Sequence, residues 1–233
     1  MFTGIIQQLG KLAAKDTAGG SLRLSIHNQK WNPLLATGES IAVNGVCLTV
    51  ARITANGFTS DMLEETARCS NLGAKRIGEA LNLERAVKLG EPLGGHMITG
   101  HVEGLGTLIR RSAVGSDWKL DFACDESLMR YIVNKGSIAC DGVSLTVSSL
   151  EKDFFSVNII PHTWQNTSLH LLKEGDKVNL ETDLIGKYVF RWLEKGQGSE
   201  IRDQRSEVGS RKAEGNQSKP ITEDLLRKAG FAS

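Results

Sequence analysis

The chain has 233 residues, of which 40% are hydrophobic, so it can bury the core of one large domain or of two ordinary ones. Its 28 Lys and Arg residues nearly balance 27 Asp and Glu residues, which argues against nucleic acid or an acidic membrane surface as a partner and favours a small ligand of low charge. The N-terminus has no signal-peptide pattern, and no run approaches the roughly 18 apolar residues of a membrane helix, so we expect a soluble, cytoplasmic protein.

Three blocks of sequence recur in the same order, which indicates a duplicated module of about 97 residues. MFTGIIQQLGKL at residues 1–12 matches MITGHVEGLGTL at residues 97–108 in six of twelve positions. TGESIAVNGVCLTV at residues 37–50 matches NKGSIACDGVSLTV at residues 134–147 in eight of fourteen positions. A third pair, RIGEALNLE and KEGDKVNLE, follows in register. The chain is therefore predicted to hold two tandem copies of one domain.

Both copies predict short strands joined by tight turns. Their central blocks are rich in β-branched residues, and each contains an Asn-Gly or Asp-Gly pair, which favours a hairpin turn. The glycines between apolar runs favour a small closed β-barrel over a parallel α/β sheet. In the second copy, Pro161 cannot continue a central strand, so it predicts an exposed backbone edge that a flat heterocycle can use.

The character of the sequence changes after the second copy. Apolar residues recur there at helical spacing, which predicts an amphipathic helix with one apolar face: Leu184, Ile185, Tyr188, Val189 and Trp192. Residues 196–219 contain few apolar side chains and are predicted to be disordered.

The cysteines and histidines do not form a metal or disulfide pattern. Cys47, Cys69, Cys124 and Cys140 are widely spaced without a CxxC pair, so we expect reduced thiols. The spacing of His96 and His101 suits neither a helical nor a stranded zinc site, and we expect no metal. The Gly pairs do not form a GxGxxG fingerprint, which argues against a dinucleotide-binding domain.

Five short motifs together carry a resemblance: MFTGI at the N-terminus, NGVCLTV in the first copy, GGHMITGH at the junction, and DGVSLTV and IPHT in the second copy. Over about residues 1–190 the chain resembles riboflavin synthase. The resemblance implies an all-β fold with two tandem six-stranded Greek-key barrels and a C-terminal α-helix. Residues 1–96 would form the N-terminal lumazine-binding barrel and residues 97–187 the C-terminal one. Residues 188–233 would supply a trimerisation helix, starting near residue 184, and a disordered tail.

The resemblance also implies an activity. Enzymes of this family convert two molecules of 6,7-dimethyl-8-ribityllumazine into riboflavin and 5-amino-6-(D-ribitylamino)uracil by transferring a four-carbon unit, without an added cofactor. A duplicated chain suits a reaction with two identical substrates. The active site would lie between the N-terminal barrel of one subunit and the C-terminal barrel of its neighbour in a homotrimer. Association with lumazine synthase is left open.

Two matching sets of substrate-binding residues follow from the resemblance. The first set comprises Gly4, Ile5, Ile6, Cys47, Leu48, Thr49, Asp61, Met62, Leu63, Glu64, Glu65 and Thr66. The second set comprises Gly100, His101, Val102, Ser144, Leu145, Thr146, Asn158, Ile159, Ile160, Pro161, His162 and Thr163. Lys135 matches a position that reaches a ligand in a neighbouring chain. The threonine hydroxyls can bond a ribityl polyol or a pteridine carbonyl.

The resemblance places Cys47, Ser144, His101 and Asp183 near the reacting atoms. Cys47 or Ser144 is a candidate to assist nucleophile addition, and His101 is a candidate proton carrier. Each residue also has a plainer interpretation. A single Cys on an apolar strand usually packs in the core, strand threonines often reflect β-propensity alone, and we expect His96 to be structural.

The alternative function is that of a non-catalytic lumazine- or flavin-binding protein. Such relatives of the fold tend to lose one of the two sites. Here both copies keep their threonines and a Cys or Ser, which favours the enzyme. A flavin-reductase barrel would show an Arg-x-Tyr-Ser/Thr signature, which RYIV at residues 130–133 does not supply.

Overall fold

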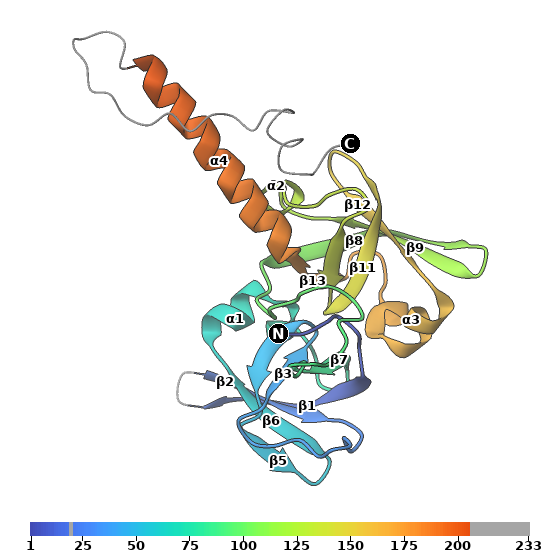
Figure 1. The fold of residues 1–233 in the computed structure, drawn as a ribbon. Helices are drawn as coiled ribbons and strands as arrows, with labels where there is room; N and C mark the ends of the chain where they lie inside the picture. Colours follow the sequence, from blue (N-terminus) through green and yellow to red (C-terminus); the bar gives the residue numbers. More distant parts are fainter. Residues whose placement is uncertain (19–20, 206–233) are drawn as a thin grey trace. The chain divides into compact units, whose positions relative to one another are not determined.

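The computed structural model describes residues 1–18 and 21–205, and both modules lie in one compact unit, Met1–Arg191. The first module, blue to cyan in Figure 1, contains β1 (Gln8–Ala18), β2 (Ser21–His27), β3 (Ser40–Val43), β4 (Val46–Thr49), β5 (Arg52–Thr54), β6 (Gly57–Met62), α1 (Glu64–Cys69), the 3-10 turn η1 (Asn71–Gly73) and β7 (Ala80–Arg85). The second, green to orange, contains β8 (Gly104–Val114), β9 (Asp117–Ala123), α2 (Glu126–Met129), β10 (Ser137–Cys140), β11 (Val143–Leu150), β12 (Phe155–Ile159), α3 (Pro161–Asn166), η2 (Ser168–Leu171) and β13 (Lys177–Thr182).

The predicted C-terminal helix is present as α4 (Leu184–Arg205). It extends past residue 196, so the prediction of disorder is wrong for residues 196–205, where Glu, Gln and Arg have high helix propensity despite two glycines. The remainder of the predicted tail lies outside the described residues. Within the described ranges, no helix is long and apolar enough to cross a membrane.

The second module is a closed six-stranded barrel with strand order β10-β11-β12-β9-β8-β13, as predicted. The first is a curled sheet of seven strands, in the order β4-β3-β7-β1-β2-β6-β5. The seventh strand arises because β4 and β5 are two parts of the strand that is continuous as β11 in the second module. The amides of Val50 and Ala51 still bond to neighbouring strands across this break. β11 has a register irregularity at the equivalent place, between Val147 and Ser149.

Each barrel has its own apolar core, formed by the alternate strand residues that point inward. In the first module Leu24, Ile26 and Phe58 are fully buried. In the second, the rings of Phe122 and Phe155 lie 5.7 Å apart between centroids. The two modules therefore have separate apolar cores, and the contacts between the modules include buried polar groups.

Buried polar groups join the two modules and repeat around an approximate two-fold axis. The backbone N–H of Asn71 donates to Asn179 Oδ1, and in the same way the backbone N–H of Ser168 donates to Asn82 Oδ1, both at 2.7 Å. The Asn82 side chain donates to the Asp141 carbonyl at 2.9 Å, and the Asn179 side chain to the Asn44 carbonyl at 2.8 Å. Because these groups are buried, each module satisfies hydrogen bonds that the other would otherwise leave unmade.

The hairpin turns predicted from Asn-Gly and Asp-Gly lie at the centre of this junction. Asn44 and Asp141 have the same left-handed backbone, with φ of 46°, and each is followed by a glycine with positive φ. A Cβ on Gly45 would lie 2.8 Å from the Gly142 amide nitrogen, and one on Gly142 would lie 2.6 Å from that of Gly45. The glycines therefore allow the turns to touch backbone to backbone.

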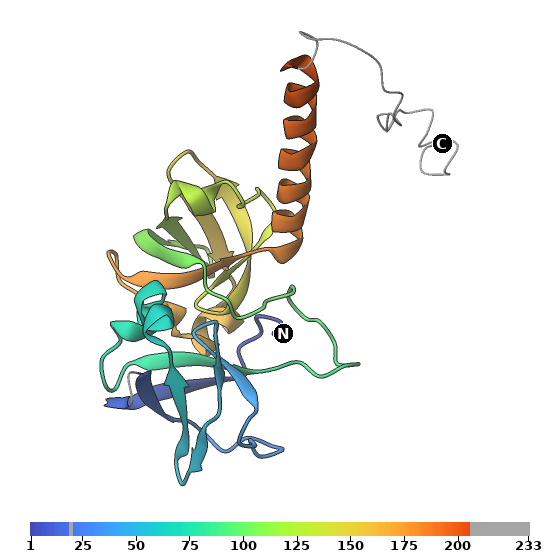
Figure 2. The ribbon, with the colours of Figure 1, turned by 90° about the vertical axis from the view of Figure 1, so that its left-hand side faces the viewer.

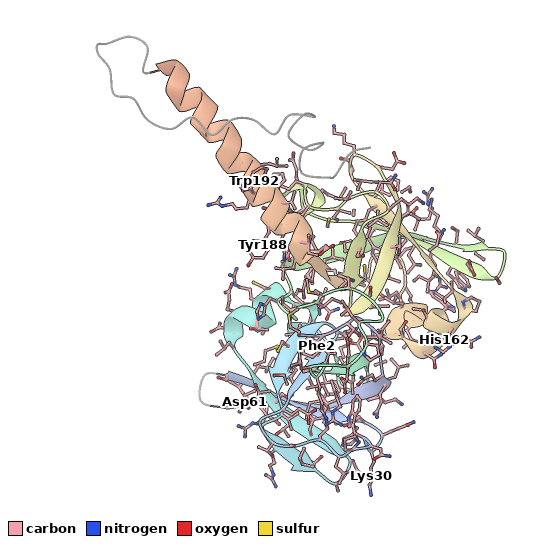
Figure 3. All side chains as sticks on the ribbon, in the orientation of Figure 1. Phe2, Lys30, Asp61, His162, Tyr188 and Trp192 are labelled. Atoms are coloured by element: carbon pink, nitrogen blue, oxygen red, sulfur yellow. The ribbon has the colours of Figure 1, made fainter. Side chains whose placement is uncertain are left out.

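The first residues of each module, 1–6 and 97–102, contact the other module and are called the crossing segments. Cys47 N donates to the carbonyl of Gly100 at 2.8 Å, and Ser144 N donates to that of Gly4 at 2.9 Å. Phe2 pairs with Ile98 between these crossings, and both side chains are fully buried or nearly so. Figure 2 shows the dark-blue N-terminal segment near the green connection between the modules, and Figure 3 places Phe2 at their junction.

A buried glutamate holds each crossing segment. The Glu84 carboxylate accepts from Thr3 N, Thr3 Oγ1 and Gly4 N at 2.6, 2.7 and 3.0 Å. Glu181 accepts from Thr99 and Gly100 in the same pattern, at 2.7, 2.7 and 3.0 Å. Burial raises the pKa of Glu84, while the three donors favour its charged form. In each module the Thr-Gly motif is thus hydrogen-bonded to a carboxylate from the last strand of the same module.

The polar symmetry is not complete, and Asp141 occupies the position of Asn44. Its Oδ1 accepts from Asn179 N and Asn71 Nδ2, both at 2.8 Å, while Oδ2 is buried and has no hydrogen-bond partner. Burial is the largest effect on this carboxyl and raises its pKa from 3.8 to about 6. The folded chain therefore holds a proton on Asp141 that the unfolded chain releases at lower pH.

We predict that this proton makes the protein less stable as pH rises from about 4 through about 6, with a total loss of about 3 kcal/mol from Asp141. Asp141→Asn should remove this slope, because Asn44 shows that an amide fits the equivalent site. Urea unfolding at pH 4.5 and 7.5 checks it: the gain in unfolding free energy from the substitution should be larger at pH 7.5. Asn44→Asp, which adds a second buried carboxyl, should show the opposite trend. An equal effect of Asp141→Asn at both pH values would contradict the assignment.

We also predict that Gly100→Ala destabilises the fold more than Gly78→Ala does. Both glycines have positive φ, +83° and +92°, so both substitutions strain the backbone. Only at Gly100 would the new Cβ lie 2.5 Å from Cys47 Cβ, whereas Gly78 has open space. The additional loss at Gly100 should be about 1–3 kcal/mol, measured by urea unfolding. Equal losses would show that the crossing segment is loosely packed.

Candidate functional site

The first hollow lies where the second module's crossing segment meets the first barrel. Its volume is about 300 Å³, and it is lined by Val46, Cys47, Glu65, Thr66, Cys69, Ser70, Gly100, His101 and Val102. The structure therefore brings together six of the predicted site residues: Cys47, Glu65, Thr66, Gly100, His101 and Val102. The grouping differs from the one expected. Residues 100–102 complete the first module's hollow, because the segment crosses over, although they were assigned to the second set.

The crossing has the reciprocal effect on the second module. Residues 4–6 lie against Ser144 rather than against Cys47, as the Gly4 contact shows. Ile6 and His162 line a second hollow, of about 430 Å³, with Gln7, Gln8, Leu9, Gln29, Gln165 and Asn166. His162 and Asn166 are the counterparts of Glu65 and Cys69 in the repeat. Each hollow is thus lined by residues of both modules.

Sequence reasoning did not select Cys69 and Ser70, which also line the first hollow. Cys69 Sγ donates to Glu65 Oε1 at 3.1 Å, and this bond is the main reason that the pKa of Cys69 is raised. Ser70 donates to the carbonyl of Thr66 at 2.7 Å. The signal was present: both lie four residues after a predicted site residue, which places them on the same helical face.

The remaining predicted residues divide by exposure. Leu48, Met62, Leu145 and Ile159 are buried with the barrel cores, so they can offer a ligand backbone groups only. Those that face outward are Ile5, Thr49, Leu63, Glu64, Thr146, Asn158, Ile160 and Pro161, while Thr163 is half-buried. Leu63 and Ile160 are 69% and 56% exposed, so their side chains are accessible to a ring.

Three predicted residues have clear local roles. Asp61 binds Arg23 through both carboxylate oxygens, at 2.6 and 3.0 Å, and this bond lowers its pKa (Figure 3). Asp183 caps α4 by accepting from Ile185 N at 3.0 Å. Lys135 is exposed, has a φ of 65°, and donates to the carbonyl of Ser148 at 3.3 Å. Neither cavity lining nor hydrogen bonding links Lys135 to the two hollows.

The polar residue at the second module's Cys47 position has an unexpected partner. Ser144 Oγ lies 2.7 Å from His96 Nδ1, so a residue expected to be structural reaches a candidate catalytic one. Burial lowers the pKa of His96, which keeps its ring neutral near pH 7. Within residues 1–18 and 21–205 there is no cluster of His, Cys, Asp and Glu that could hold a metal ion.

Comparison with known proteins agrees with this architecture. The lumazine binding domain model matches residues 3–86 and 99–183. Riboflavin synthase of Actinobacillus pleuropneumoniae is 39% identical over 231 residues, covering 99% of this chain and 100% of the relative. That of Bacillus subtilis (strain 168) is 41% identical, covering 84% and 91%.

Two solved structures of LumP share the fold. The complex with riboflavin has a TM-score of 0.72 at 26% identity, and the complex with 6,7-dimethyl-8-(1'-D-ribityl) lumazine has a TM-score of 0.70 at 24% identity. Both matches cover 78% of this chain and 99% of the other. The two matched domains and the extent of the sequence identity show that the chain belongs to the riboflavin synthase family.

Proposed function

We propose that each module binds one 6,7-dimethyl-8-ribityllumazine and that the chain, a transferase, converts two of them into riboflavin and 5-amino-6-(D-ribitylamino)uracil. The observation that carries this proposal is the repeated contact between the modules: Cys47 packs on Gly100 as Ser144 packs on Gly4. Two equivalent sites in one chain suit two identical substrates. The domain boundaries follow the repeat, with the first barrel at residues 1–96 and the second at residues 97–187.

In this reaction one lumazine loses a proton from its C7 methyl group, and the other is attacked at C7. Holding the two rings face to face supplies much of the acceleration, because it replaces an encounter with a fixed geometry. Cys47 or Ser144 would assist the addition of a nucleophile, and the exposed His101 would carry the proton. Asp183 would contribute its negative charge near the second site. The chemistry needs no added cofactor.

The assembly we propose is a homotrimer in the cytoplasm, with each active site between the first module of one chain and the second module of its neighbour. The apolar face of α4 supports an interface. Tyr188 and Trp192, four residues apart on this helix, are 71% and 68% exposed (Figure 3). Ile185 and Val189 extend the same face. Lys135, which lines neither hollow in its own chain, would reach a ligand held by a neighbouring chain.

Incubation of the protein with 6,7-dimethyl-8-ribityllumazine tests the activity directly. We expect riboflavin fluorescence to appear with one riboflavin formed for every two lumazines consumed, because the four-carbon unit lost by one becomes part of the other. The alternative, a binding protein like LumP in fold, would retain lumazine without forming riboflavin. The absence of product from correctly folded, ligand-bound protein would favour that alternative.

Mixed trimers test the shared site. Cys47→Ala with Thr66→Ala impairs the first module, and Ser144→Ala with Thr163→Ala impairs the second. Each variant alone should be nearly inactive, because every active site contains one impaired module. When the two are unfolded together and refolded, about a quarter of the sites should pair two intact modules, since each has an even chance of being intact. The measurement is riboflavin formation by the whole refolded mixture, relative to the wild-type protein.

The control is each variant refolded with itself. Mixed trimers that are no more active than these controls would rule out a site formed between chains and would place both substrates within one chain.

A further inference from the structure

We propose that His96 is a positioning residue of the second module's lumazine site. Its imidazole holds the Ser144 hydroxyl in the orientation that meets a bound lumazine. The proposal rests on the proposed function for its substrate. It goes beyond that function because it gives the two pockets different chemistry.

The backbone places His96 against Ser144 with little freedom. His96 N donates to the carbonyl of Thr3 at 3.1 Å, and Thr3 is itself held by the buried Glu84. A Cβ on Gly95 would lie 2.1 Å from that same carbonyl and 2.8 Å from Ser144 Oγ. The close approach of the segment is thus possible only with glycine at position 95. The imidazole follows directly and reaches Ser144 Oγ at 2.7 Å.

The other ring nitrogen has no protein partner. His96 is only 9% exposed, and its Nε2 is buried without a hydrogen bond. Buried polar atoms in proteins are almost always paired, so an unpaired one on the ring that contacts Ser144, a substrate-binding residue in the proposed function, indicates a group that the ligand completes. In a neutral imidazole one nitrogen donates and the other accepts. If Nδ1 accepts from Ser144, Nε2 is a free donor; in the other tautomer, the serine hydroxyl is the free donor.

The surroundings support a neutral ring whose proton can be shared. Burial lowers the pKa of His96, and the negative charge of Asp183 acts in the opposite direction. Asp183 caps α4 and so stands at a fixed place. A neutral imidazole beside a hydroxyl is the arrangement that orients and polarises that hydroxyl.

The repeat provides an internal comparison. Cys47 is the counterpart of Ser144, and within the described residues no histidine side chain is hydrogen-bonded to it. His96 lies at the end of the first module, outside the repeated blocks, and a shift of 97 residues leads to Leu193 in α4, beyond the second module. One pocket therefore offers a thiol and the other a hydroxyl that is tied to an imidazole. Two identical substrates would meet different groups, as a reaction with a donor and an acceptor requires.

A double-mutant cycle between His96 and Ser144 tests the proposal. His96→Phe should lower kcat for riboflavin formation by about tenfold or more and leave KM for lumazine within about twofold, because it disturbs the hydroxyl and not the ring contacts. His96→Asn, whose amide reaches the place of Nδ1, should restore part of the rate. In a Ser144→Ala background, His96→Phe should cost less than about twofold, since the group it positions is already gone.

Cys47→Ala is the matched background, because it alters the equivalent position of the other module. There His96→Phe should retain its full effect. An equal loss from His96→Phe with and without Ser144 would overturn the proposal and show a structural role. If the wild-type protein forms no riboflavin, the proposed function fails by itself. The His96 imidazole is then followed by NMR as riboflavin is added, and ring signals that do not respond to the bound ligand would likewise overturn the proposal.

Discussion

The buried polar junction between the modules is the interaction on which the two hollows depend. Its asparagines and backbone groups are satisfied across the junction, and each one left unpaired would cost about 1–3 kcal/mol. Apolar surfaces can slide past one another, but a set of directional bonds with backbone contact between Gly45 and Gly142 permits a single arrangement. That arrangement brings Gly100 to Cys47 and Gly4 to Ser144, so the cavity walls are a consequence of the junction.

The crossing segments explain what sequence could and could not predict. The repeat in register gave the module number, the hairpin turns and the equivalence of Cys47 with Ser144, because these depend on local pattern and on comparison of the chain with itself. The repeat could not show which module's Thr-Gly segment lines which hollow, since both modules contain that motif. Residues 100–102 were therefore grouped with the wrong hollow. The break between β4 and β5 was missed for a similar reason, because Val50 and Val147 look alike in sequence.

His96 shows the other limit of sequence reasoning. It lies outside the three repeated blocks, so comparison of the two copies gave it no support, and a histidine after two glycines is commonly a turn residue. Only the fold reveals that Gly95 packs on the carbonyl of Thr3 and so delivers the ring to Ser144. Internal symmetry identifies what both modules share, and it is silent about what one of them alone has gained.

The modules differ in residues at their hollows, while most of the residues that hold the crossing segments are the same. Glu84 and Glu181 make the same three bonds, and both crossing glycines keep the same backbone conformation. The exchanged residues include Glu65 for His162 and Cys69 for Asn166, which line the hollows, and Cys47 for Ser144. A reaction that joins two copies of one molecule needs two sites that bind the same substrate, and it needs different chemical groups at the donor and at the acceptor. Duplication supplies the first requirement through the scaffold, and divergence of the linings supplies the second.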